Sequence, residues 1–303
     1  MITEILKEIG SAKTKDDREF LKSLNLYLKG EKLEIFIKDF QNNREGNEAK
    51  INENYPNLIQ QLSFYYLLLQ DINSSIKASY DNKKNKDEIK NRLNVCTKLY
   101  NKSLQIFTDM FSLLENGSGL NALLLWRVIY ENYAIVNYIT NGKEEEAKLF
   151  NEYEVVQKNK LLGVKITKEE KEKFAKKYGR DFDSNEYCWA KFIRGKKSFL
   201  KIIRSIKEKK FYKYYLLSNN IGRSNAFSVN NGIVYNEKAG SKATAFSSDD
   251  VTKGLSIFIS VLTEFAGIMI DNYIDDKKSK ETLKKMVVHF GKQIDRKWKK
   301  ITD

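Results

Sequence analysis

Hydrophobic and polar residues alternate along most of this chain with the period of an α-helix. Apolar residues recur at spacings of three and four in the segments about 57–80 and about 86–115, which predicts two long helices. The same pattern occurs in three N-terminal segments, 2–9, about 16–29 and about 31–44. One proline and 15 glycines leave few helix breakers. We therefore predict an all-α fold, with residues 1–55 as N-terminal accessory helices and residues 56–303 as the main helical bundle domain.

Two further segments, about 119–140 and about 249–274, are apolar on nearly every face, which is typical of central core helices. Arg127 and Glu131 interrupt the first, and Glu264 interrupts the second. A membrane-spanning helix needs about 20 apolar residues, and a central charge opposes its insertion. We therefore expect two core helices and no membrane partner.

The region between these two helices is predicted to be less regular. We expect a helix at about 143–162, a basic section up to residue 217, and one long loop at 222–248 that contains at most a small hairpin. A loop of this length in a compact domain is often functional. It precedes the helix that carries Glu264, where it could reach a site.

A polar stripe runs along each apolar helix. Arg127, Glu131 and Tyr138 share one face of the first helix, and Glu264 lies on a similar stripe of the second. Because unpaired buried charges are costly, the stripes are expected to face each other or a common cavity. In a functional site, Arg127 would hold an anionic group such as a phosphate, Glu131 would orient it or act as a base, and Tyr130 or Tyr138 would supply a hydroxyl. Glu264 is the third candidate catalytic residue of this site. The alternative is an Arg/Glu network that only fixes the register of the helices.

Positive charge is concentrated in one part of the chain. The formal net charge is +14, and residues 157–215 alone contribute +12. Five of their cations are the candidate binding residues Arg194, Lys196, Lys197, Lys201 and Arg204. Ten aromatic residues lie among the cations: Tyr178, Phe182, Tyr187, Trp189, Phe192, Phe199, Phe211, Tyr212, Tyr214 and Tyr215. This pattern favours binding of nucleic acid or another polyanion, with aromatic rings stacking on bases. The alternative is a solvated, lysine-rich helical face.

Cysteine and histidine are too few for the common metal and redox sites. Cys96 and Cys188 are 92 positions apart and His289 is the single histidine, so neither a disulfide scaffold nor a zinc site is supported, and we predict no metal ligands. The N-terminus has no signal-peptide pattern. We expect a cytoplasmic protein with reduced, structural thiols.

Short motifs resemble a known family. The segments LLLWRVIYENYAIVNYI, KLFNEYEVVQKNKLL and FYKYYLLSNNIGRSNAF, in this order, resemble the bacterial domain-of-unknown-function family 5677 over about residues 60–275. The matching positions are Arg127 with Glu131, Glu152 with Tyr153, and Tyr215 with Ser218. Where the family tends to place a histidine after the serine, this chain has Asn219, Asn220 and Ile221. The resemblance implies a compact helical bundle with no established reaction, and adds Glu152, Tyr153, Ser218 and Asn220 as candidate binding residues.

Three functions remain open at this point. The chain is also similar to helical domains of bacterial conflict systems, which suggests a phage-defence or toxin-type protein that binds nucleic acid or a nucleotide through residues 157–215 and the Arg/Glu site. It lacks the Arg-x4-6-His motif of the HEPN ribonucleases among them. The second function is a non-enzymatic scaffold or sensor, with a homodimer or a protein partner. The third is a metal-dependent phosphoryl hydrolase that uses Glu131 and Glu264.

Overall fold

The computed structural model describes residues 49, 53, 58–115, 119–221, 234–236, 241–243 and 248–302. The chain divides into two units, Met1–Glu53 and Asn54–Asp303, and every element below belongs to the second unit. The helices predicted at 2–9, about 16–29 and about 31–44 lie outside the described residues. The domain division at residue 55 stays a prediction.

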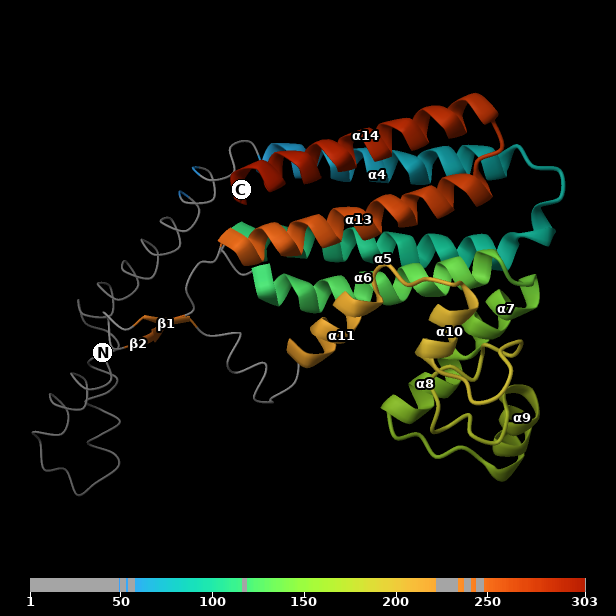
Figure 1. Cartoon of the computed structure of the whole chain (residues 1–303). Coiled ribbons are helices and arrows are strands. Elements are labelled where there is room, and N and C mark those ends of the chain that lie inside the picture. The colour runs from blue at the N-terminus through green and yellow to red at the C-terminus, as the bar shows by residue number, and fades with distance from the viewer. Residues whose placement is uncertain are drawn as a thin grey trace, which may run out of the picture. The chain divides into compact units, whose positions relative to one another are not determined.

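Five long helices run side by side and form the body of the second unit (Figure 1). They are α4 (Leu58–Asp81), α5 (Lys90–Glu115), α6 (Gly119–Thr140), α13 (Ser248–Tyr273) and α14 (Lys277–Thr302). Helix α13 contacts the other four, so it is the central helix of the bundle. The all-α fold is confirmed, and α6 and α13 are the two apolar central helices that the sequence predicts.

One buried tryptophan, Trp126, links α6 to α13. Trp126 of α6 is fully buried, and its indole N–H donates to the carbonyl oxygen of Ile257 on α13 at 3.2 Å. Its ring stacks on Tyr130 with centroids 5.2 Å apart. By length and composition, Leu255–Tyr273 is the one described segment that is apolar enough to cross a membrane. In the structure, 56% of its most apolar stretch is buried inside the bundle.

Shorter elements lie between α6 and α13 and before α5. They are η1 (Lys86–Glu88), α7 (Glu144–Glu152), α8 (Glu154–Leu161), α9 (Lys168–Tyr178), α10 (Phe199–Ser205), α11 (Tyr212–Ile221), β1 (Val234–Asn236) and β2 (Ser241–Ala243). The single helix expected at 143–162 is divided at Tyr153, whose hydroxyl donates to the carbonyl of Asn185 at 2.7 Å. Strands β1 and β2 pair antiparallel as the small hairpin that was expected, and the rest of 222–247 lies outside the described residues.

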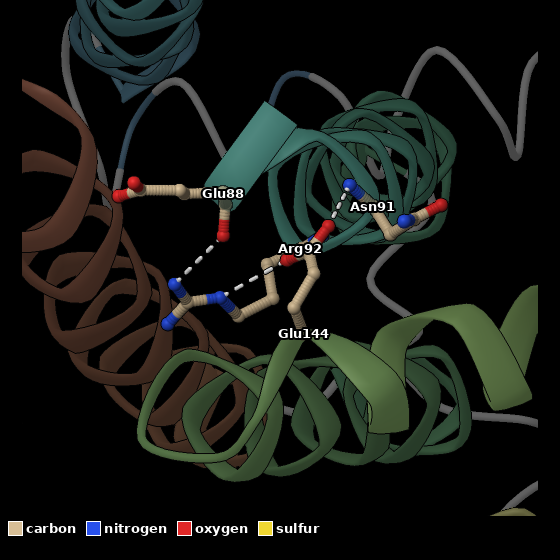
Figure 2. Close-up of polar contacts among 4 residues, drawn as sticks. All are labelled: Glu88, Asn91, Arg92 and Glu144. Atoms are coloured by element: carbon tan, nitrogen blue, oxygen red, sulfur yellow. Dashed lines mark hydrogen bonds and ion pairs between the residues drawn. The ribbon is translucent and has the colours of Figure 1, made fainter. Parts of the chain in front are cut away.

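Glu144, the first residue of α7, links that helix by hydrogen bonds to the start of α5 (Figure 2). Its carboxylate accepts hydrogen bonds from the backbone N–H of Asn91 and, at 3.2 Å each, from the backbone N–H and the Nε of Arg92. The first N–H groups of a helix have no partner within the helix, and a carboxylate there also suits the helix dipole. Glu144 therefore caps α5 from a different helix.

Candidate nucleic-acid interface: a basic pocket beside α6, α7 and α10

A surface pocket of about 720 Å³ lies where the end of α6, the start of α7, the segment 192–194 and α10 meet. This volume is in the range of about 300–1,000 Å³ that is typical of ligand sites. The lining residues are Tyr138, Asn141, Gly142, Glu146, Phe192, Ile193, Arg194, Lys201, Arg204, Ser205, Ile206 and Lys207. Four of them, Tyr138, Arg194, Lys201 and Arg204, are among the binding residues that the sequence suggested.

Four cationic side chains surround the pocket, and all four are exposed: Arg194, Lys201, Arg204 and Lys207. Within the described part of the chain, none of the four side chains makes an ion pair or a hydrogen bond. The remaining two predicted cations lie elsewhere: Lys196 is exposed outside the lining, and the Nζ of Lys197 donates to the carbonyls of Cys188 and Tyr178 at 3.1 and 3.4 Å. Lys197 therefore links the backbone at residues 178 and 188, whereas the pocket cations remain available for an anion.

A buried carboxylate is among the residues that line the pocket. Glu146 is 2% exposed and accepts hydrogen bonds from the hydroxyl of Tyr138 and from the backbone N–H of Phe192, the latter at 3.4 Å. Burial raises the pKa of Glu146, and the two donors partly oppose this effect. Glu146 thus joins α7 to α6 and to the segment that carries Phe192 and Arg194.

Gly142 makes room for this carboxylate. A Cβ atom at this position would lie 2.5 Å from Oε2 of Glu146 and 3.1 Å from the carbonyl oxygen of Tyr138. Real Cβ atoms do not approach other heavy atoms so closely, so a side chain at position 142 would displace Glu146.

Lys207 reaches the pocket from an unusual backbone conformation. Its φ is +56°, and it is the one described residue other than glycine with a positive φ. It follows the C-terminus of α10, where the N–H of Lys207 bonds to the carbonyl of Arg204 at 3.2 Å and that of Glu208 to the carbonyl of Ile203 at 3.2 Å. This pattern is a Schellman motif, in which glycine usually occupies the left-handed position. A lysine here is conformationally costly, and its side chain lines the pocket.

Half of the ten aromatic residues suggested for stacking belong to the core. Five of the ten are at most 6% exposed: Tyr178, Phe182, Trp189, Phe199 and Phe211. Tyr187, Tyr212, Tyr214 and Tyr215 are partly exposed. Phe192 is the one ring of the ten in the exposed class, at 43%, and it lies in the pocket lining. The five buried rings are not accessible to a base, and of the ten rings only Phe192 lines this pocket. Stacking of bases on the partly exposed tyrosines stays a prediction.

Arg127 and Glu131 form the ion pair that their spacing suggested, but the expectation that both side chains are buried is wrong. Nε of Arg127 is 3.0 Å from Oε1 of Glu131, with side chains 42% and 25% exposed. The guanidinium carbon lies 5.6 Å from the ring centroid of Tyr215 on α11. The stripe thus faces α11 at the edge of the bundle, so its charges keep part of their hydration. Neither residue lines the pocket.

Glu264 does not join the Arg127–Glu131 pair. Its Oε1 lies 3.1 Å from Nζ of Lys210, and the two side chains are 50% and 60% exposed. The expectation of one buried site with Arg127, Glu131 and Glu264 is therefore corrected to two separate surface ion pairs. Among the described residues, no group of three or more His, Cys, Asp or Glu side chains is placed to hold a metal ion.

The remaining candidates make contacts within the fold. The buried hydroxyl of Tyr130 donates to Glu208 at 2.5 Å, and Glu152 pairs with Lys177 at 2.7 Å. Tyr153 is 2% exposed and bonds the carbonyls of Phe182 and Asn185. Ser218, which is buried, and Asn220, which is exposed, each donate to a carbonyl one turn earlier in α11, at 2.8 and 2.9 Å. None of these residues lines the basic pocket.

Sequence reasoning missed Glu146, Lys207 and Gly142. The run Glu144–Glu146 after Asn141 and Gly142 indicates the start of a helix, but it does not show which acid is buried. Lys207 is one of many lysines in the segment, and only the backbone angle distinguishes it. Gly142 gave the one usable signal, because a glycine before a helix indicates a turn or a close approach.

The fold and the pocket define an all-α protein with a basic site at one end of its bundle. Residues 93–225 match the model of a family of unknown function (DUF5677), which confirms the resemblance over this shorter stretch. The matched stretch includes every residue that lines the pocket. Comparison with curated proteins and with solved structures gives no match.

Proposed function

We propose that this protein binds nucleic acid through the basic pocket, with phosphate groups held by Arg194, Lys201, Arg204 and Lys207. The single observation that carries the proposal is that these four exposed cations surround one pocket and make no ion pair among the described residues. Other cations of the described residues, such as Lys177, Lys191 and Lys284, pair with acids, whereas Lys168, Lys171 and Lys209 are exposed without an ion pair there but do not line this pocket. Arginine and lysine are the side chains that bind phosphate.

The left-handed lysine gives independent support. A non-glycine residue at this conformation is uncommon and costs conformational energy, and such residues often occur at functional sites. Glycine would fit the backbone of position 207 better, but it would remove one of the four cations. The position of this charge is therefore consistent with use in binding.

The first test is the salt dependence of binding. With four cations on phosphates of a single strand, log K should fall against log salt with a slope of about −3, or about −0.7 for each contact. This corresponds to roughly 60-fold weaker binding at 200 mM than at 50 mM salt. Fluorescence anisotropy with a labelled 12-nucleotide RNA and its DNA equivalent measures it. Binding that is undetectable, or that does not change with salt, contradicts the proposal.

The second test separates binding from folding at Lys207. We expect Lys207→Gly to leave the free energy of unfolding unchanged or to raise it by up to about 1 kcal/mol, because glycine relieves the left-handed strain. The same variant should bind the labelled RNA about tenfold more weakly or worse, since a charge-assisted hydrogen bond contributes about 1.5–3 kcal/mol. Lys209→Gly is the matched control, because Lys209 is exposed but lies outside the pocket. Equal affinity of the two variants would count against a role for Lys207.

The phage-defence or toxin role and the cytoplasmic location stay predictions. The scaffold and hydrolase alternatives are also untested. Their candidate residues Arg127, Glu131 and Glu264 lie in surface ion pairs outside the pocket, so the nucleic-acid proposal does not use them.

A further inference from the structure

We propose that the pocket takes a single unpaired nucleotide of the bound strand, with its base stacked on Phe192. The protein would therefore select single-stranded nucleic acid over a duplex. This inference rests on the proposed function, because it assumes that the pocket cations hold the adjoining phosphates.

The exposure of Phe192 is the first observation behind it. A phenylalanine normally buries its ring, as Phe182, Phe199 and Phe211 of the same segment do. Phe192 instead keeps 43% of its surface exposed and lines a pocket whose other exposed side chains are largely cationic. A ring of this kind offers an apolar face to a flat ligand that also carries negative charge.

The backbone that carries the ring is also restrained. The backbone N–H of Phe192 donates to the buried carboxylate of Glu146 at 3.4 Å, and Nζ of Lys143 lies 4.8 Å from the ring centroid. The N–H bond restrains the backbone that carries the ring, so less freedom is lost when a base stacks on it. Lys143 is exposed and adds a fifth cation, which lies over one face of the ring.

The form of the nucleic acid follows from this arrangement. In a duplex both faces of each base are covered by neighbouring bases, and the phosphates are the part that a basic surface reaches. A base can stack on a protein ring only where the strand is single or the base is turned out, and proteins that bind single strands combine aromatic rings with a basic groove in this way. One exposed ring in one pocket fits one base, and the cations around it fit the phosphates on either side.

The experiment compares wild-type protein with Phe192→Leu and Phe192→Trp. Anisotropy is measured with a 12-nucleotide single-stranded RNA, the same sequence as DNA, and a 12-base-pair duplex, and inorganic tripolyphosphate is used as a competitor. Phe192→Leu should weaken single-strand binding about 5- to 150-fold and leave tripolyphosphate competition unchanged. Phe192→Trp should retain binding, and its added fluorescence should be quenched by the strand. Phe64→Leu is the matched control, since Phe64 is 48% exposed on α4 and lies outside the pocket.

The outcomes separate this inference from the function on which it rests. If Phe192→Leu binds the single strand as tightly as the wild type, or if the wild type prefers the duplex, stacking on Phe192 is overturned but phosphate binding stands. If Phe192→Leu weakens tripolyphosphate and the single strand equally, the ring acts on the pocket as a whole and the inference also fails. If the wild type binds neither nucleic acid nor tripolyphosphate, both proposals fail.

Discussion

The double variant Lys201→Glu/Arg204→Glu is expected to lose nucleic-acid binding by about 10²- to 10⁴-fold. Each side chain would contribute a charge-assisted hydrogen bond of about 1.5–3 kcal/mol to a phosphate, and both bonds are lost. The slope of log K against log salt should become shallower by about 1.4, because two phosphate contacts are removed. Both residues are exposed on α10 and make no ion pair among the described residues, so the helix content and the melting temperature should change little.

A matched control decides whether nucleic acid binds at the pocket or is attracted by the overall positive charge. Lys168→Glu/Lys171→Glu reverses two exposed lysines at the same spacing of three on α9, outside the pocket, and changes the formal net charge by the same amount. We expect this control to weaken binding less than tenfold, through the long-range field alone. If the two double variants weaken binding equally, binding belongs to the general positive charge of residues 157–215 and the pocket is not the site.

Truncation of Trp126 is expected to have the largest effect on stability. Trp126→Ala should lower the free energy of unfolding by about 3–5 kcal/mol, because it opens a cavity and removes the hydrogen bond from the indole to the carbonyl of Ile257. Its ring also meets Phe211 and Tyr214 edge-on at 6.3 and 6.2 Å, so α11 loses contacts as well. Urea unfolding followed by circular dichroism measures the change.

The control for this prediction is another aromatic truncation. Phe64→Ala removes a ring that is 48% exposed and lies 4.7 Å from the ring of Phe290, and it should cost only about 1–2 kcal/mol. A loss as small for Trp126→Ala would mean that the contact between α6 and α13 does not depend on this residue. The comparison therefore tests the architecture of the core without reference to any ligand.

The long helices could be predicted because their apolar residues repeat over many turns. The expected helix at 119–140 has the observed bounds of α6, and that at 249–274 differs from α13 by one residue at each end. The break at Tyr153 could not be predicted, because the apolar pattern continues through it. The hydroxyl of Tyr153 bonds the carbonyl of Asn185, which lies 32 positions further along the chain. Periodicity records neighbours within a helix and carries no information on such distant contacts.

The candidate site could be predicted only in part, for the same reason. The spacing of Arg127 and Glu131 correctly placed both on one face of the helix. It could not show which element packs against that face, and in the structure Arg127 lies against Tyr215 of α11. Charge density correctly drew attention to Arg194, Lys201 and Arg204. It could not distinguish them from Lys197, whose Nζ is used by two backbone carbonyls.

Because Gly142 lies so close to Glu146, the residue type that is tolerated at one of these positions depends on the other. A substitution at 142 is tolerated only if the carboxylate at 146 leaves its place, and the loss of that carboxylate removes the partner of Tyr138 and of the Phe192 backbone. Relatives of this chain with a side chain at 142 should therefore either lack an acid at 146 or hold its carboxylate in a different place, and carry a differently arranged 190–195 segment. Among relatives, a glycine at 142 together with an acid at 146 would mark those that share the pocket, independently of how many lysines surround it.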